Sequence, residues 1–163
     1  MSTPDPRRPE SAGVSVVLAL VFAVIGFFAL AVFGLGAVSL VTDAEIIAVP
    51  GLGPLPGVLG MLAAMLGFVA ALARALQRVR PRFASVPVIA LVAALVHLAV
   101  VWLCVLIATG GVVTATVVAG DLVTGGASAV VLVAAAVAGW GGIALRRTRA
   151  QHPRWRWERD DDE

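Results

Sequence analysis

The sequence predicts an all-α fold, an integral membrane four-helix bundle whose N- and C-termini are cytoplasmic. Four apolar stretches, at residues 14–41, 57–76, 86–108 and 127–145, occupy most of the 163-residue chain, and Arg74 is the one charged residue inside them. Hydrophobic residues make up 60% of the chain and charged residues only 13%, whereas about 25% of a soluble domain is charged. A bilayer demands such stretches, because a charge at its centre costs several kcal/mol.

Each stretch fits the thickness of a membrane, which takes about 20 residues of helix to cross. The first stretch is longer than needed, so we expect it to tilt or to extend past the bilayer. It also exceeds the roughly 7–15 apolar residues of a cleavable signal peptide, and we therefore expect it to be retained. The second stretch reaches a full span by continuing through Arg74, whose long side chain can extend to the headgroups.

Glycine and proline mark the boundaries of the predicted helices. These turn residues are Pro50, Gly51, Gly53, Pro54, Pro56, Gly57, Pro81, Pro87, Gly110, Gly111, Gly125 and Gly126. They divide the chain into a disordered cytoplasmic N-terminus (1–13), a four-span transmembrane domain (14–145) and a cytoplasmic Arg/Trp-rich tail with an acidic end (146–163). The segment 109–126 lies between the third and fourth spans and could either cap the bundle or dip back into it.

The arginines predict the orientation. All 12 basic residues are arginines, and in a four-span chain all of them lie on one side. They precede the first span, join the second to the third and follow the fourth, whereas the other two connections carry Asp43, Glu45 and Asp121 and no base. The positive-inside rule makes the arginine side cytoplasmic. We therefore expect a multi-pass protein of the bacterial cytoplasmic membrane.

Small residues recur at steps of three and four in every span and predict the faces on which the helices meet. The predicted faces are Ala19, Ala23, Gly26, Leu30 and Gly34 in the first span; Gly60, Ala64, Gly67 and Ala71 in the second; Ala90, Ala94, His97, Val101, Cys104 and Ala108 in the third; and Ala127, Val131, Ala134, Ala138 and Gly142 in the fourth.

His97 is the candidate intramembrane polar site, because it lies at the middle of the third span on the small-residue face. A functional imidazole there would bind a proton, a metal or a haem. A structural one would be neutral and hydrogen-bonded to a neighbouring carbonyl or hydroxyl. We favour the structural interpretation, since no second ionisable group is present for a relay. The other histidine, His152, lies beyond the fourth span, although a symmetric dimer could pair His97 with its copy.

The sequence shows no nucleotide motif, zinc cluster or catalytic nucleophile with a partner base. We therefore expect no catalytic, cofactor-binding or metal-binding residues and no enzymatic activity. The spans lack Asp and Glu, which excludes an acid-driven proton or cation antiporter. Nucleic acid is not an expected partner, because the basic segments are short and tied to the membrane.

The basic segments are candidates for contact with the bilayer and its anionic lipid headgroups, because arginine attracts phosphate and tryptophan settles at the interface. These residues are Arg74, Arg78, Arg80, Arg82, Arg146, Arg147, Arg149, Arg154, Trp155, Arg156 and Trp157. The simpler interpretation is that the arginines set the topology and the tryptophans anchor the chain.

The Arg-only basic set, the Ala/Val/Gly-rich spans and the Arg/Trp tail resemble the small four-span membrane proteins of actinobacterial type whose function is unknown. The resemblance covers the whole chain and transfers no functional residue. Three functions stay open: a non-catalytic structural or accessory subunit, as a homo-oligomer or in a larger complex; a small transporter or pore formed by oligomerisation, with His97 facing the interior; and a redox subunit that uses His97 to hold a cofactor.

Overall fold

The computed structural model describes residues 14–42, 53–78 and 81–147. In these ranges the regular structure is entirely helical, which confirms the predicted all-α class. The elements are α1 (Val16–Thr42), α2 (Leu55–Leu76), the short 3-10 helix η1 (Phe83–Ser85), α3 (Val86–Thr109), α4 (Val112–Thr124) and α5 (Ala127–Arg147). Four of them, α1, α2, α3 and α5, are long and apolar enough to cross a membrane.

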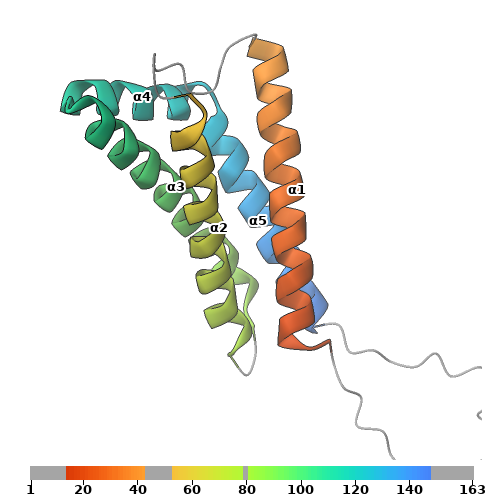
Figure 1. Ribbon diagram of the computed structural model, residues 1–163. Helices are drawn as coiled ribbons and strands as arrows, with labels where there is room; N and C mark the ends of the chain where they lie inside the picture. The colour runs from red at the N-terminus through yellow and green to blue at the C-terminus, as the bar shows by residue number, and fades with distance from the viewer. Residues whose placement is uncertain (1–13, 43–52, 79–80, 148–163) are drawn as a thin grey trace, which may run out of the picture.

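The segment between the third and fourth long helices is itself a helix, α4, which lies across one end of the bundle (Figure 1). Gly110 ends α3 with a φ of 67°, and Gly126 precedes α5 with a φ of 86°. Glycine adopts these left-handed conformations without the steric penalty of a side chain. Ala115 and Leu122 turn the buried side of α4 toward α3 and α5. Of the two alternatives that the sequence left open, the structure shows the cap.

The four long helices pack side by side, α2 against α3, α3 against α5 and α5 against α1. The contact between α1 and α2 is smaller and includes a ring stack between Phe27 and Phe68, whose centroids are 4.8 Å apart. These two rings, both fully buried, belong to the main hydrophobic core together with alanines from every long helix. Small side chains dominate the rest of this core, so the helix backbones approach closely.

The small-residue pattern predicts the buried face of α5 better than the buried faces of α3 and α1. All five positions predicted in α5 are buried. In α3 the predicted row is buried as far as Val101, but it then continues to Val105, while Ala108 is exposed. In α1 the predicted row is correct at Ala19 and Ala23 and wrong at Gly26 and Leu30, in whose place Phe27 and Ala31 are buried. Its last member, Gly34, is partly buried and closely approaches Val130 of α5. Helices that cross at an angle meet along the ridge of every fourth residue, and that ridge drifts away from a straight stripe.

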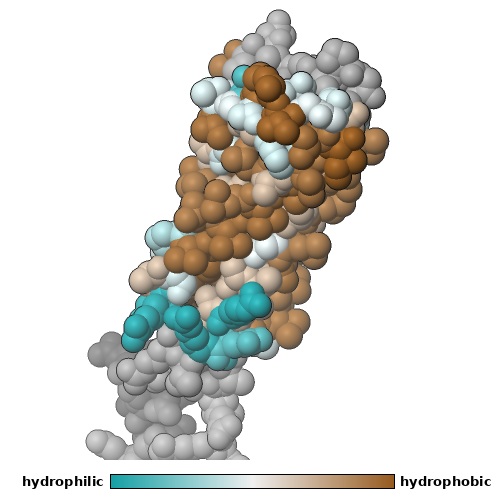
Figure 2. Space-filling view, turned by 90° about the vertical axis from the view of Figure 1, so that its left-hand side faces the viewer, coloured by the Kyte–Doolittle hydropathy of each residue, from teal (hydrophilic) through white to brown (hydrophobic). Residues whose placement is uncertain are grey.

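The basic residues of the described chain gather at the end of the bundle opposite α4, whereas the acidic Asp121 lies on α4 itself. The start of α1, the connection from α2 to η1 and the end of α5 all lie there (Figure 1). Figure 2 shows a broad hydrophobic band, with hydrophilic side chains at that end of the face in view. The molecule therefore has a basic end and an α4 end, separated by an apolar band.

Candidate functional site

His97 lies inside the bundle, on the side of α3 that faces α2. It is 3% exposed and is the one polar residue classed as buried in the described part of the chain. Gly60 of α2 makes room for it, because a Cβ atom added to Gly60 would lie 3.1 Å from Nδ1 of His97 and 2.5 Å from Cγ2 of Val101. The imidazole thus occupies space that a side chain at position 60 would fill.

The imidazole is only partly satisfied by its surroundings. The ring interacts with the backbone of Gly60, but Nδ1 forms no hydrogen bond of normal geometry with any described residue. Leaving a buried polar atom without a partner costs about 1–3 kcal/mol. His97 therefore makes the fold less stable than an apolar side chain of similar size would at this position.

The neighbourhood of His97 offers little additional chemistry. Among the described residues no group of three His, Cys, Asp or Glu side chains could hold a metal ion. Cys104 lies further along α3 and is half-buried. A second enclosed polar atom without a partner in the described ranges, Oγ of Ser128, belongs to α5. The small-residue pattern of the sequence did not indicate this serine, although it stands beside Ala127 in an otherwise apolar run.

At the basic end, the neighbouring residues Arg146 and Arg147 make different contacts. Arg146 is half-buried, and its Nη1 donates a hydrogen bond of 3.0 Å to the carbonyl oxygen of Val14, two residues before the start of α1. Arg147 is exposed, and its guanidinium carbon lies 4.8 Å from the centre of the Phe83 ring. Phe83 in turn stacks on Trp140 with a centroid separation of 6.2 Å.

The other predicted lipid contacts are placed only in part. The side chains of Arg74, Arg78 and Arg82 are exposed, at the end of α2 and in the connection that leads to η1. The remaining ones, Arg80, Arg149, Arg154, Trp155, Arg156 and Trp157, lie outside the described residues.

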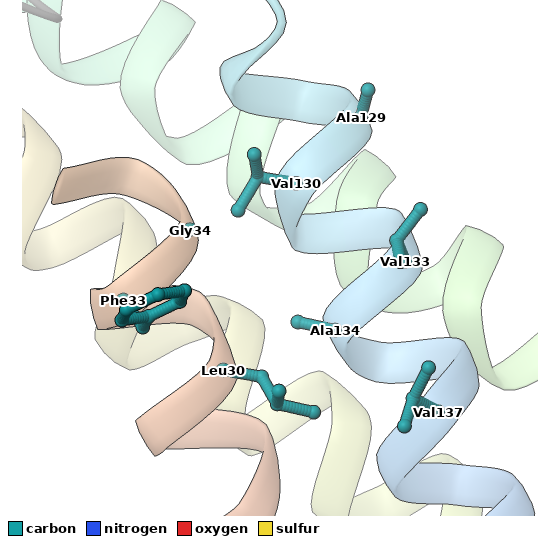
Figure 3. A pocket seen from close by; sticks show the side chains of 8 residues that line it. All are labelled: Leu30, Phe33, Gly34, Ala129, Val130, Val133, Ala134 and Val137. Carbon is teal, nitrogen blue, oxygen red and sulfur yellow. The ribbon is translucent and has the colours of Figure 1, made fainter. Parts of the chain in front are cut away.

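An apolar groove of about 370 Å³ separates α1 from α5 (Figure 3). Gly34 and Val130 face each other at this groove so closely that a Cβ atom on Gly34 would lie 2.5 Å from Cγ1 of Val130. The eight lining residues are Leu30, Phe33, Gly34, Ala129, Val130, Val133, Ala134 and Val137. Since none of them has a polar side chain, the groove itself offers no group for catalysis.

A protein-family model matches residues 11–163 of the chain. The chain belongs to DUF6121, a family of unknown function. No curated protein and no solved structure matches it. Membership agrees with the resemblance to an uncharacterised family, and it assigns no role to any residue.

The described geometry points to two places with chemistry. One is the enclosed imidazole of His97. The other is the row formed by Arg147, Phe83 and Trp140 on the outside of the basic end. The charge pattern of the sequence indicated Arg147 but neither of the two aromatic residues. Phe83 follows Arg82 directly, and Trp140 lies on the same face of α5 as Arg147, seven residues away. This closeness of each aromatic residue to an arginine is the feature of the sequence that could have indicated them.

Proposed function

We propose that this protein is a multi-pass protein of the bacterial cytoplasmic membrane that serves as a structural or accessory subunit and has no catalytic activity. The observation that carries this proposal is the packed apolar interior. Alanine side chains and the Phe27–Phe68 stack fill the main core, and in the described ranges His97 is the one fully buried polar residue. Such an interior holds helices together without providing groups for a reaction.

The outer surface supports placement in a bilayer. The long helices expose large apolar side chains toward the outside, including Phe33, Leu66 and Ile107, each more than 70% exposed. Contiguous apolar surface on this scale is a liability in water, and lipid chains match it. The apolar band in Figure 2 has the same character over the face in view.

The charge distribution supports an orientation with the basic end in the cytoplasm. Arg74, Arg78, Arg82, Arg146 and Arg147 all belong to that end. Asp121 is exposed on α4, at the other end. In this orientation both termini are cytoplasmic, and α4 covers the outer end of the bundle.

Single-cysteine labelling in intact cells tests both the membrane placement and the orientation. Replacing Cys104 with alanine removes the one native thiol, and Gln77→Cys or Asp121→Cys then adds an exposed thiol at either end. A membrane-impermeant maleimide should label Asp121→Cys in intact cells and Gln77→Cys only after permeabilisation. The reverse pattern would overturn the orientation, and recovery of folded monomer from a detergent-free soluble fraction would overturn the membrane placement.

The burial of His97 favours an accessory role over a pore. A path formed between copies of the chain would run along the outer faces of the helices. His97 instead lies against Gly60 between α2 and α3, with 3% exposure. It could line such a path only after α2 and α3 separated.

Flux and cofactor content provide the functional tests. Proteoliposomes containing the wild type or His97→Ala should show the same background permeability to protons and small ions. A wild-type flux that His97→Ala abolishes would contradict the accessory role and favour a transporter. A haem absorbance band in the purified protein would favour the redox subunit. Purification in a mild detergent should recover a defined complex, either with another membrane protein or between copies of this chain.

A further inference from the structure

We propose that Arg147, Phe83 and Trp140 form a binding site for the phosphate and upper glycerol region of an anionic phospholipid. This inference rests on the proposed function, because it requires the basic end to lie at the cytoplasmic surface of a bilayer. It goes further by assigning one lipid contact to three named side chains, two of which the charge pattern alone does not select.

The guanidinium of Arg147 is available to a ligand. Its guanidinium lies over the Phe83 ring, and a cation stacked on a ring face keeps its in-plane N–H groups free to donate. Its one recorded interaction with the described residues is this ring contact. The ring therefore orients a planar donor set that matches the geometry of a phosphate.

Arg146, in contrast, is bound within the fold. The adjacent arginine is half-buried and donates to the carbonyl oxygen of Val14, joining the start of α1 to the end of α5. Its Nη1 is thus used within the fold. Of these two neighbouring arginines at the end of α5, Arg146 joins two helices, and only Arg147 presents its charge on an exposed side chain.

An aromatic surface lies beside the guanidinium of Arg147. Trp140 is 57% exposed and Phe83 is 37% exposed, and their rings stack. Trp140 stands seven residues before Arg147 on α5, which places it about 10 Å further along the helix toward the apolar band. A phospholipid has the same order of groups, with a charged phosphate above an ester region and acyl chains, and indole rings favour that interfacial depth.

Charge complementarity identifies the occupant as anionic. Arg82 directly precedes Phe83 and is exposed, and the end of α2 adds Arg74 and Arg78. A basic residue near the membrane surface contributes about 1 kcal/mol of attraction to anionic lipid. A zwitterionic lipid carries its own cation beside the phosphate, so it gains less from this cluster.

Contact quenching of Trp140 by brominated lipid tests the site directly. Trp102→Phe, Trp155→Phe and Trp157→Phe leave Trp140 as the one tryptophan of the four in the chain. The protein is reconstituted into phosphatidylcholine vesicles with increasing fractions of brominated phosphatidylglycerol, and in parallel with brominated phosphatidylcholine. We expect phosphatidylglycerol to occupy the position next to Trp140 with a preference of about fivefold, the ratio that about 1 kcal/mol provides.

Two substitutions separate the site from general surface charge. Arg147→Gln should remove most of the preference and leave only the weaker attraction of Arg74, Arg78 and Arg82, whereas Arg146→Gln, which removes the same charge one residue away, should retain most of it. Arg147→Lys keeps the charge without the planar fork and should give an intermediate value. A preference that survives Arg147→Gln, or that Arg146→Gln abolishes equally in a folded protein, would overturn the inference.

The outcome also distinguishes this inference from the proposed function. If the protein floats with the vesicles but Trp140 shows no preference for phosphatidylglycerol, the lipid site is wrong and the membrane placement stands. If the protein does not associate with vesicles at all, the proposed function fails first. Circular dichroism of the Arg147 variants should show unchanged helix content, because the side chain of Arg147 is exposed.

Discussion

The half of the bundle toward the basic end and the half toward α4 are held together differently. Toward the basic end, all four long helices share one core that includes Phe27, Phe68 and Leu72. Toward α4, a smaller cluster joins α3, α4 and α5, while Leu40 and Val41 of α1 are each 86% exposed. Packing of all four long helices therefore stabilises the half toward the basic end, whereas contacts with α4 contribute to the stability of the other half.

The largest expected effect comes from removing a ring of the shared core. Phe27→Ala eliminates the stack with Phe68 and leaves a cavity, which should lower the free energy of unfolding by about 3 kcal/mol. Phe28→Ala is the matched control, because Phe28 is 50% exposed and its loss should change stability little. The measurement is the unfolding equilibrium in mixed detergent micelles. Equal effects of the two substitutions would contradict the assigned core.

A smaller and more local effect is expected at the α4 end. Leu122→Ala removes a buried side chain from the minor cluster and should reduce stability by about 2 kcal/mol. Hydrogen exchange should accelerate in α4 and in the adjoining end of α3, with α1 and α2 unchanged. Val123→Ala, at an exposed neighbour, is the control. Faster exchange throughout the chain would show that the two halves unfold as one unit.

The close approach of α2 and α3 gives the next effect. In Gly60→Ala the new methyl group meets Val101 and the His97 ring, so we expect a loss of about 1–3 kcal/mol from overpacking. Adding Val101→Ala should restore part of that loss by removing the nearer contact. Gly26→Ala has open space around the new atom and should stabilise the helix by about 0.5–1 kcal/mol. A neutral Gly60→Ala would argue against the tight packing.

The smallest expected effect concerns the side-chain hydrogen bond between α3 and α4. Trp102 Nε1 donates to Thr116 Oγ1 over 3.4 Å, and the pair is exposed. Trp102→Phe should therefore lower stability by about 0.5 kcal/mol. A double-mutant cycle with Thr116→Val isolates the bond, and a coupling energy of zero would show that α4 is held by packing alone.

The long helices were predictable because their signal is local. Apolar length and the Gly/Pro boundaries place α2, α3 and α5 within a few residues of the expected ranges. The buried row of α5 was also predictable, because Ala127 and Gly142 lie on one straight stripe. The row of α1 was predictable only in part, at Ala19, Ala23 and Gly34. The rest of its course depends on the angle at which α1 crosses its neighbours, and one sequence does not contain that angle.

Helix α4 and the environment of His97 could not be predicted from the local sequence. Residues 112–118 are mostly β-branched, a composition that is more typical of strands than of helices, so the sequence left their conformation open. Glycines at 110 and 126 allow the turns, and packing of Ala115 and Leu122 completes the helix. His97 could be assigned to the interior from its stripe, but its close partner Gly60 became visible only when α2 and α3 were placed side by side.

The sequence by itself determined four apolar helices and the gathering of arginines at one end, because hydrophobicity and charge are properties of each residue and of its spacing. Only the tertiary structure decided which contacts two identical neighbouring residues make. Arg146 reaches the carbonyl of Val14 and Arg147 lies over Phe83, although both are arginines at the end of one helix. Successive residues of a helix point in different directions, and what each one meets is set by the element packed on that side.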